Sequence, residues 1–285
     1  MARQGMARLG VTFGRAAAAA ALAVALAACG GSQSDQIPLE SYSAEQLYQR
    51  AELELETAKA KDAAKYFGEV ERLYPYSDWA KRALIMQAFA YHKGRDYESA
   101  RGAAQRFLAT YPADDDAAYA QYLVALSYYD QIDQVGRDQG LTYQALQSLR
   151  KVIEDYPDSD YARSAILKFD LAFDQLAAKE MEIGRFYLKR GYFVAGINRF
   201  RTVVTDFQTT SQTPEALYRL VECYLSLGLN DQAQTAGAIL GHNFQSTDWY
   251  HDAYVLLTGR GLRPEAKGEG WLRDIWRQTV RGEWL

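Results

Sequence analysis

A spacing that recurs five times constrains this 285-residue chain more than any other feature. In each copy a small residue stands eleven positions before an aromatic one, and positions four and seven are mostly apolar. Positions 0, 4, 7 and 11 lie on one face of an α-helix, so each copy predicts a helix with one buried side. The five pairs are Ala63 with Tyr74, Ala100 with Tyr111, Ala145 with Tyr156, Gly196 with Phe207, and Ala233 with Phe244.

The residue after the aromatic indicates where each of these helices ends. It is Pro75, Pro112 or Pro157 in the first three copies, and Gln208 or Gln245 in the last two. Proline stops a helix because it lacks the N–H and clashes with the preceding turn. The copies recur every 37 to 51 residues, near the period of tetratricopeptide arrays. We therefore expect an all-α, tetratricopeptide-like α-solenoid of about five helix pairs with a C-terminal extension helix, a fold that holds partners.

The gaps between the copies predict the first helix of each pair. Their expected ranges are 43–58, 78–93, 116–130, 159–189 and 213–227. The fourth is long, and the sequence leaves open whether it is one helix or breaks near Leu176. Thr213 is expected to cap its helix ahead of Pro214. Glycines before four anchors are expected to take the positive φ of a tight turn, namely Gly94, Gly140, Gly191 and Gly228.

The amino terminus predicts export and lipidation. Three arginines precede the apolar run 16–28, which is too short to span a bilayer. Residues 26–29, Leu-Ala-Ala-Cys, are typical of a bacterial lipobox, so we expect residues 1–28 to be a lipoprotein signal peptide. Cys29 would then carry a diacylglycerol thioether and an N-acyl chain, and residues 29–42 would be a flexible tether. The alternative is a plain secretory signal with an incidental cysteine.

The residue after Cys29 predicts the destination. Gly30 is not the aspartate that marks inner-membrane retention, so we expect anchoring in the outer membrane, facing the periplasm. Removing the signal takes away three arginines and no acid, so a net charge of −4 becomes −7. An acidic chain argues against nucleic acid as a partner. The second cysteine, Cys223, is expected to be a small buried hydrophobe.

The sequence motifs do not indicate a catalytic or metal-binding site. The sequence has no phosphate-binding glycine loop, no dinucleotide fingerprint, and no paired Cys or His at metal-ligand spacing. We expect no catalytic residue, no metal and no cofactor apart from the covalent lipid on Cys29. The interpretation is a non-enzymatic protein that holds other polypeptides.

Several local strings narrow the family. Residues 74–80 and 156–162 share an aromatic-Pro-x-Ser-Asp-aromatic-Ala pattern. The long connection 133–142 and the string Phe-Tyr-Leu-Lys-Arg-Gly at 186–191 are equally specific. With the lipobox and the helix pairs, these strings resemble the BamD family of outer-membrane assembly lipoproteins, from about residue 29 to 244.

The resemblance implies a scaffold that helps fold and insert outer-membrane β-barrel proteins. It implies that the carboxy-terminal repeats bind the periplasmic domains of a BamA-type insertase, beside other BAM lipoproteins. Carried over by residue, the partner-facing positions are Lys189, Arg190, Asn198 and Arg199. The amino-terminal repeats would receive unfolded outer-membrane proteins in a groove that includes Tyr48, Tyr66, Tyr76 and Trp79. For each of these residues the alternative is ordinary packing or a solvated charge.

The resemblance leaves the end of the chain unexplained. We place the tetratricopeptide domain at residues 43–258 and an extension at 259–285. Between positions 269 and 285 the apolar residues fall mostly on one helical face, and arginines recur every four residues. The apolar set is Trp271, Leu272, Ile275, Trp276 and Trp284. This amphipathic helix would either cap the last repeat or dock to a subunit or the lipid interface.

Another periplasmic tetratricopeptide lipoprotein, either a secretin pilotin or a cell-envelope coordinator, is the alternative function. Recovery of a secretin without the insertase in a pull-down would favour that alternative.

Overall fold

A computed structural model describes residues 38–281 of the chain. It divides into two units. The described part of the first, residues 38–43, holds a short 3-10 turn, η1 (Leu39–Ser41). The second unit begins at Ala44 and holds all the described α-helices.

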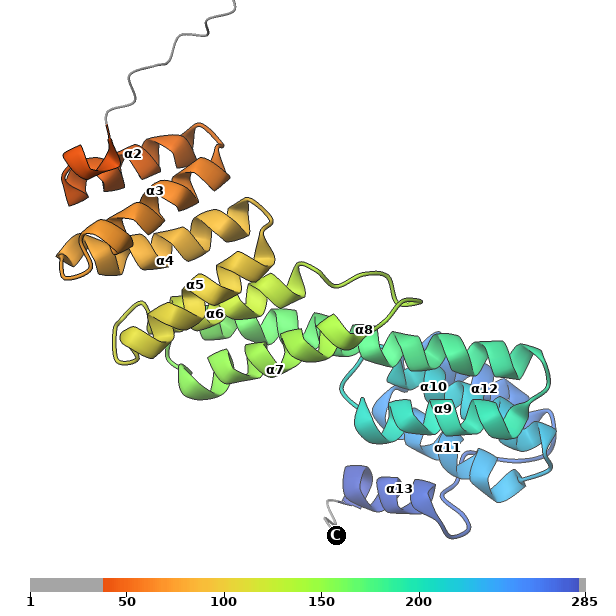
Figure 1. Ribbon diagram of the computed structural model, residues 1–285. Coiled ribbons are helices and arrows are strands. Elements are labelled where there is room, and N and C mark those ends of the chain that lie inside the picture. The colour runs from red at the N-terminus through yellow and green to blue at the C-terminus, as the bar shows by residue number, and fades with distance from the viewer. Residues whose placement is uncertain (1–37, 282–285) are drawn as a thin grey trace, which may run out of the picture. The chain divides into compact units, whose positions relative to one another are not determined.

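The second unit is a succession of antiparallel helix pairs, each packed on the next (Figure 1). No strand occurs among the described residues. Five pairs precede two final helices, so the expected all-α fold of about five pairs is confirmed. The pairs are α2 (Ala44–Glu56) with α3 (Ala60–Leu73), α4 (Asp78–Lys93) with α5 (Tyr97–Thr110), α6 (Ala117–Tyr129) with α7 (Gly140–Asp155), α8 (Asp160–Lys189) with α9 (Phe193–Asp206), and α10 (Thr213–Ser226) with α11 (Asn230–Asn243).

The repeated spacing marks the buried face of the second helix in every pair. Positions 0, 4 and 7 are buried in all five copies. In α3, for example, Ala63, Phe67 and Val70 are fully shielded from solvent. Burying a side chain the size of Phe67 or Val70 contributes about 1.5–3 kcal/mol, which is why the helices pair.

The aromatic residue of each copy caps its helix by the same hydrogen bond. Its backbone N–H donates to the carbonyl of the residue at position 7, over 2.7 to 3.1 Å. The last two helices end at the same register, before Phe207 and Phe244, although no proline follows them. The turn after the aromatic residue therefore ends each helix, and a proline reinforces that end where one is present.

A hydroxyl three residues after the aromatic builds that turn, a signal that the sequence interpretation missed. In four copies this hydroxyl donates to the aromatic residue's carbonyl over 2.8 Å. In three of these it also accepts the N–H of the third residue of the next helix. The four residues are Ser77, Ser159, Thr210 and Thr247. One side chain therefore closes one helix pair and opens the next.

Local predictions at three positions were wrong. Gly191 and Gly228 have the expected positive φ of 76° and 72°, but Gly94 has a φ of −77° and Arg95 takes the left-handed conformation at 60°. Gly140 is the first residue of α7. Thr213 does not cap α10, because it is already helical and its hydroxyl donates to the Phe207 carbonyl over 3.0 Å.

The fourth unit begins with one unbroken 30-residue helix, which settles the question left open at Leu176. The first half of α8 places Ala165 in a core cluster with residues of α6 and α7, while Leu176 and Met181 belong to the cluster built from α9, α10 and α11. Gly184 allows close approach to α9, since a Cβ there would lie within 2.9 Å of three carbons of the Phe200 ring. This helix thus belongs to two successive parts of the core.

The extension folds back on the array. After α12 (Asp248–Thr258), the Thr235 hydroxyl of α11 donates to the Lys267 carbonyl over 2.7 Å and accepts the Lys267 N–H over 2.9 Å. The final helix, α13 (Trp271–Arg281), packs on α11, and its Leu272 and Ile275 are buried in the same core cluster. The expected amphipathic helix is therefore present. Trp284 lies outside the described residues.

Candidate partner-binding surface

The turn between α8 and α9 carries the first two predicted partner-facing residues. α8 ends at Lys189, Arg190 follows as its C-cap, and Gly191 reverses the chain with positive φ. The N–H of Tyr192 donates to the carbonyl of Tyr187 over 3.0 Å, which closes the turn. Lys189 and Arg190 are both exposed as a result. The Arg190 guanidinium lies 3.8 Å from the centroid of the half-exposed Phe186 ring.

Asn198 and Arg199 lie on α9, where the structure brings them together at a hollow of about 230 Å³. Tyr187 of α8 and two small residues of α9, Ala195 and Thr202, complete its lining. The Arg199 Nη1 donates to the Oε2 of Glu180 on α8 over 3.0 Å. The guanidinium is thus at the surface and already paired.

A second hollow of about 520 Å³ adjoins the first, because Ala195 and Asn198 line both. Its apolar lining comes from two turns that are far apart in the sequence. Tyr192 and Val194 follow the α8–α9 turn, and Leu227 follows α10. All three side chains are at least 40% exposed. Exposed apolar side chains that cluster in this way are typical of docking surfaces.

We call this surface the α8–α9 face and define it as Tyr187, Tyr192, Val194, Ala195, Asn198, Arg199 and Leu227. The sequence predicted Asn198 and Arg199 as partner-facing, which stays a prediction, and it did not point to the apolar part of this face. The available signal was an apolar residue beside each turn glycine, Tyr192 after Gly191 and Leu227 before Gly228.

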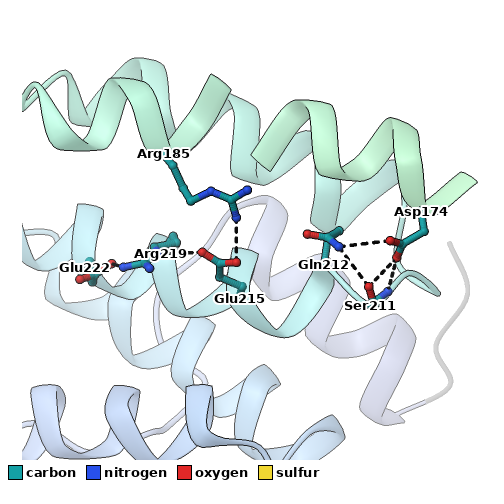
Figure 2. Close-up of polar contacts among 7 residues, drawn as sticks. All are labelled: Asp174, Arg185, Ser211, Gln212, Glu215, Arg219 and Glu222. Carbon is teal, nitrogen blue, oxygen red and sulfur yellow. Dashed lines mark hydrogen bonds and ion pairs between the residues drawn. The ribbon is translucent and has the colours of Figure 1, made fainter. Parts of the chain in front are cut away.

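A chain of ion pairs fixes α8 against α10, as Figure 2 shows. The Arg185 Nη1 donates to Glu215 Oε2 over 2.8 Å, and Glu215 Oε1 accepts from Arg219 Nε over 3.2 Å. Arg219 Nη1 then donates to Glu222 over 2.7 Å. Burial alone would lower the pKa of Arg219, but its hydrogen bonds to Glu222 and Glu215 outweigh burial and raise that pKa.

A second polar cluster holds the first half of α8 to the start of α10 (Figure 2). The Asp174 carboxylate accepts the Ser211 N–H over 2.8 Å and the Ser211 hydroxyl over 2.7 Å. It also accepts from the Gln212 side chain over 3.2 Å. Because α8 is held at two points along its length, the α8–α9 turn has a fixed position relative to α10.

The four residues proposed for a substrate groove fall into different environments. Tyr48 is buried, and its ring centroid lies 5.0 Å from that of Trp79, while Arg82 stacks over the Trp79 ring. Tyr66 is half-buried under the Arg50 guanidinium, and Tyr76 is fully exposed. The structure thus brings Tyr48 and Trp79 together as a packed pair.

The predicted lipid site, Cys29, and the whole signal region 1–28 lie outside the described residues. Within residues 38–281, no helix has the length and apolar character needed to cross a bilayer. In the same range no three acidic, His or Cys side chains are grouped so that they could hold a metal ion.

Comparison with known proteins identifies the family. Residues 40–239 match the family model YfiO, described as an outer membrane lipoprotein. The chain is 47% identical over 248 residues to the outer membrane protein assembly factor BamD of Caulobacter vibrioides, covering 87% of this chain and 81% of that protein. It is 43% identical over 211 residues to BamD of Rickettsia prowazekii, covering 74% and 84%. BamD of Neisseria meningitidis serogroup A is 28% identical over 246 residues, covering 82% and 92%. The chain therefore belongs to the BamD family of outer membrane lipoproteins.

Proposed function

We propose that the chain binds the periplasmic domains of a BamA-type insertase through the α8–α9 face. Membership in the BamD family makes the chain a non-enzymatic component of the BAM complex at the outer membrane, where it serves outer-membrane protein assembly. The family match favours this function over a secretin pilotin or a cell-envelope coordinator.

One observation carries the proposal, namely two adjoining hollows that combine exposed apolar side chains with Asn198 and Arg199. An interface needs an apolar core to exclude water and polar groups to fix the register. Arginine suits a carboxylate of the partner because its planar fork can bind both oxygens and it is always charged. Lys189 and Arg190 would border the same contact.

The remaining contacts follow from the same family assignment. The amino-terminal helix pairs would receive unfolded outer-membrane β-barrel proteins, and other BAM lipoproteins would bind elsewhere on the array. The acyl chains on Cys29 would hold the protein on the periplasmic side of the outer membrane. The lipobox supports this anchor, and two or more chains anchor stably where one chain binds weakly.

Charge reversal at Arg199 tests the proposed interface. Arg199→Glu should lower the recovery of the insertase from detergent-solubilised envelopes about tenfold or more, because opposing a buried interfacial charge costs at least about 2 kcal/mol. Arg163→Glu is the matched control, since Arg163 is 85% exposed on α8 and lies 3.8 Å from its acidic neighbour. It should leave recovery unchanged. Circular dichroism should show the same helical content in both variants, and wild-type recovery with Arg199→Glu would refute the interface.

A further inference from the structure

We infer that Glu180 is an internal competitor for the Arg199 guanidinium, and that a carboxylate of the bound partner displaces it. This inference rests on the proposed function, because it describes how the α8–α9 face is occupied before the partner arrives. The partner group is identified by its chemistry, a carboxylate that enters the hollow lined by Arg199.

The Glu180–Arg199 contact leaves most of the guanidinium available. It consists of one hydrogen bond, from Nη1 to Oε2 over 3.0 Å. A guanidinium has five N–H donors, and Arg199 makes no other hydrogen bond to a residue within the described part of the chain. The Arg199 side chain is 43% exposed and that of Glu180 is 20% exposed. The cation therefore faces solvent more than its internal partner does.

Two other arginines, Arg185 of α8 and Arg219 of α10, are committed to the fold. Arg219 binds two carboxylates, those of Glu215 and Glu222, and its side chain is only 23% exposed. Arg185 binds the same Glu215, which is 14% exposed. Releasing either would break the chain of contacts that holds α8 to α10. Arg199 has a single ion pair to give up, and unlike the exposed Arg190 it lines the first hollow, so it is the arginine that a carboxylate entering that hollow can recruit.

Exchange is favourable because the two ion pairs differ in strength. A single hydrogen bond to a guanidinium that is 43% exposed is weak, since water and salt screen it. A partner carboxylate that enters the hollow can bind both arms of the fork and becomes desolvated there. The two carboxylates would then repel each other beside one cation. Glu180 thus lowers affinity for every partner, and a carboxylate that binds both arms of the guanidinium overcomes this cost more easily than one that binds a single arm.

Glu180→Gln tests the inference because it removes the competing charge and keeps the shape. The probe is the purified periplasmic part of the BamA-type insertase, titrated against the full-length chain in detergent. We expect the dissociation constant to fall about two- to fivefold, the range set by the strength of an exposed ion pair. The gain should vanish at high salt.

Glu182→Gln is the matched control. It removes the same charge two residues along α8, from an exposed side chain without an ion pair to any described residue. It should leave the dissociation constant unchanged. An unchanged or higher dissociation constant for Glu180→Gln would overturn the inference, because Glu180 would then orient Arg199 and not compete for it. An equal gain from Glu182→Gln would overturn it as well, since the effect would be one of net charge.

A double variant distinguishes loss of binding from loss of folding. Glu180→Arg with Arg199→Glu restores the internal pair with opposite polarity, so the melting temperature should match the wild type while binding is lost. If Arg199→Glu alone binds the insertase normally, the proposed function itself fails. If Arg199→Glu weakens binding and Glu180→Gln does not tighten it, only the competitor role fails.

Discussion

At the scale of the residue, Cys223 packs in the core as a small apolar side chain, although it carries a thiol. The side chain is fully buried in the core cluster of α8 to α11, as its helical apolar context indicated. Gly196 lies against it, since a Cβ at that glycine would be 3.7 Å from the Cys223 sulfur. Burial raises the pKa of the thiol to about 12. The thiolate, which is the reactive form, is therefore absent at neutral pH.

We predict that the Cys223 thiol does not react with thiol reagents in the folded protein. A thiol whose pKa is about 12 carries almost no thiolate at pH 8. Ellman's reagent should leave the native mature protein unmodified over an hour and react with one thiol after denaturation in guanidinium. Rapid modification of the native protein would contradict the buried position.

Some residues of the candidate site could be found from the sequence and others could not. Asn198 and Arg199 follow a string that resembles the family, so the resemblance pointed to them as partner-facing. Glu180 stands 19 positions earlier, on the other helix of the pair, and only the packing of α8 on α9 brings the two together. Leu227 lies opposite Tyr192 and Val194 for the same reason. Such contacts depend on the tertiary structure.

At the scale of the element, the sequence predicted the helices well because each carries its own start and stop. The range 78–93 matches α4 at both ends, and the other first helices differ by one or two residues. The turns were harder. The left-handed conformation in this turn falls on Arg95, although the neighbouring Gly94 would adopt it at no steric cost. The geometry of the turn therefore outweighs the preference of arginine for negative φ.

The contact between α8 and α9 gives a prediction at this scale. Gly184→Ala should destabilise the protein by about 1–2 kcal/mol, because the added methyl group would overlap the fully buried Phe200 ring. Gly102→Ala is the matched control in α5, where a Cβ meets nothing within 4 Å. It should stabilise by about 0.5–1 kcal/mol through helix propensity alone. Guanidinium unfolding measures both, and stabilisation by Gly184→Ala would refute the close approach.

At the scale of the whole molecule, the extension acts on the array as a cap. α13 lies outside the residues matched by the family model, yet its Leu272 and Ile275 belong to the core cluster that is built from α8 to α11. The segment between α12 and α13 is held by hydrogen bonds from Gln234 and Thr235, two buried polar residues of α11. Terminal helices of this kind cover apolar surface that the next repeat would otherwise bury.

Removing residues 268–285 should therefore lower the melting temperature by at least about 6 °C, since the array loses the buried contacts of two aliphatic side chains. Recovery of the insertase should stay at the wild-type level. A truncated protein that melts normally but no longer recovers the insertase or other envelope partners would show that α13 is a docking helix.

Photo-crosslinking in living cells would show whether the α8–α9 face meets the insertase. A photoreactive amino acid at Asn198, which lines both hollows, should give an adduct with the BamA-type insertase. The same amino acid at the exposed Lys151 of α7 should not. An insertase adduct from position 151 and none from position 198 would contradict the account.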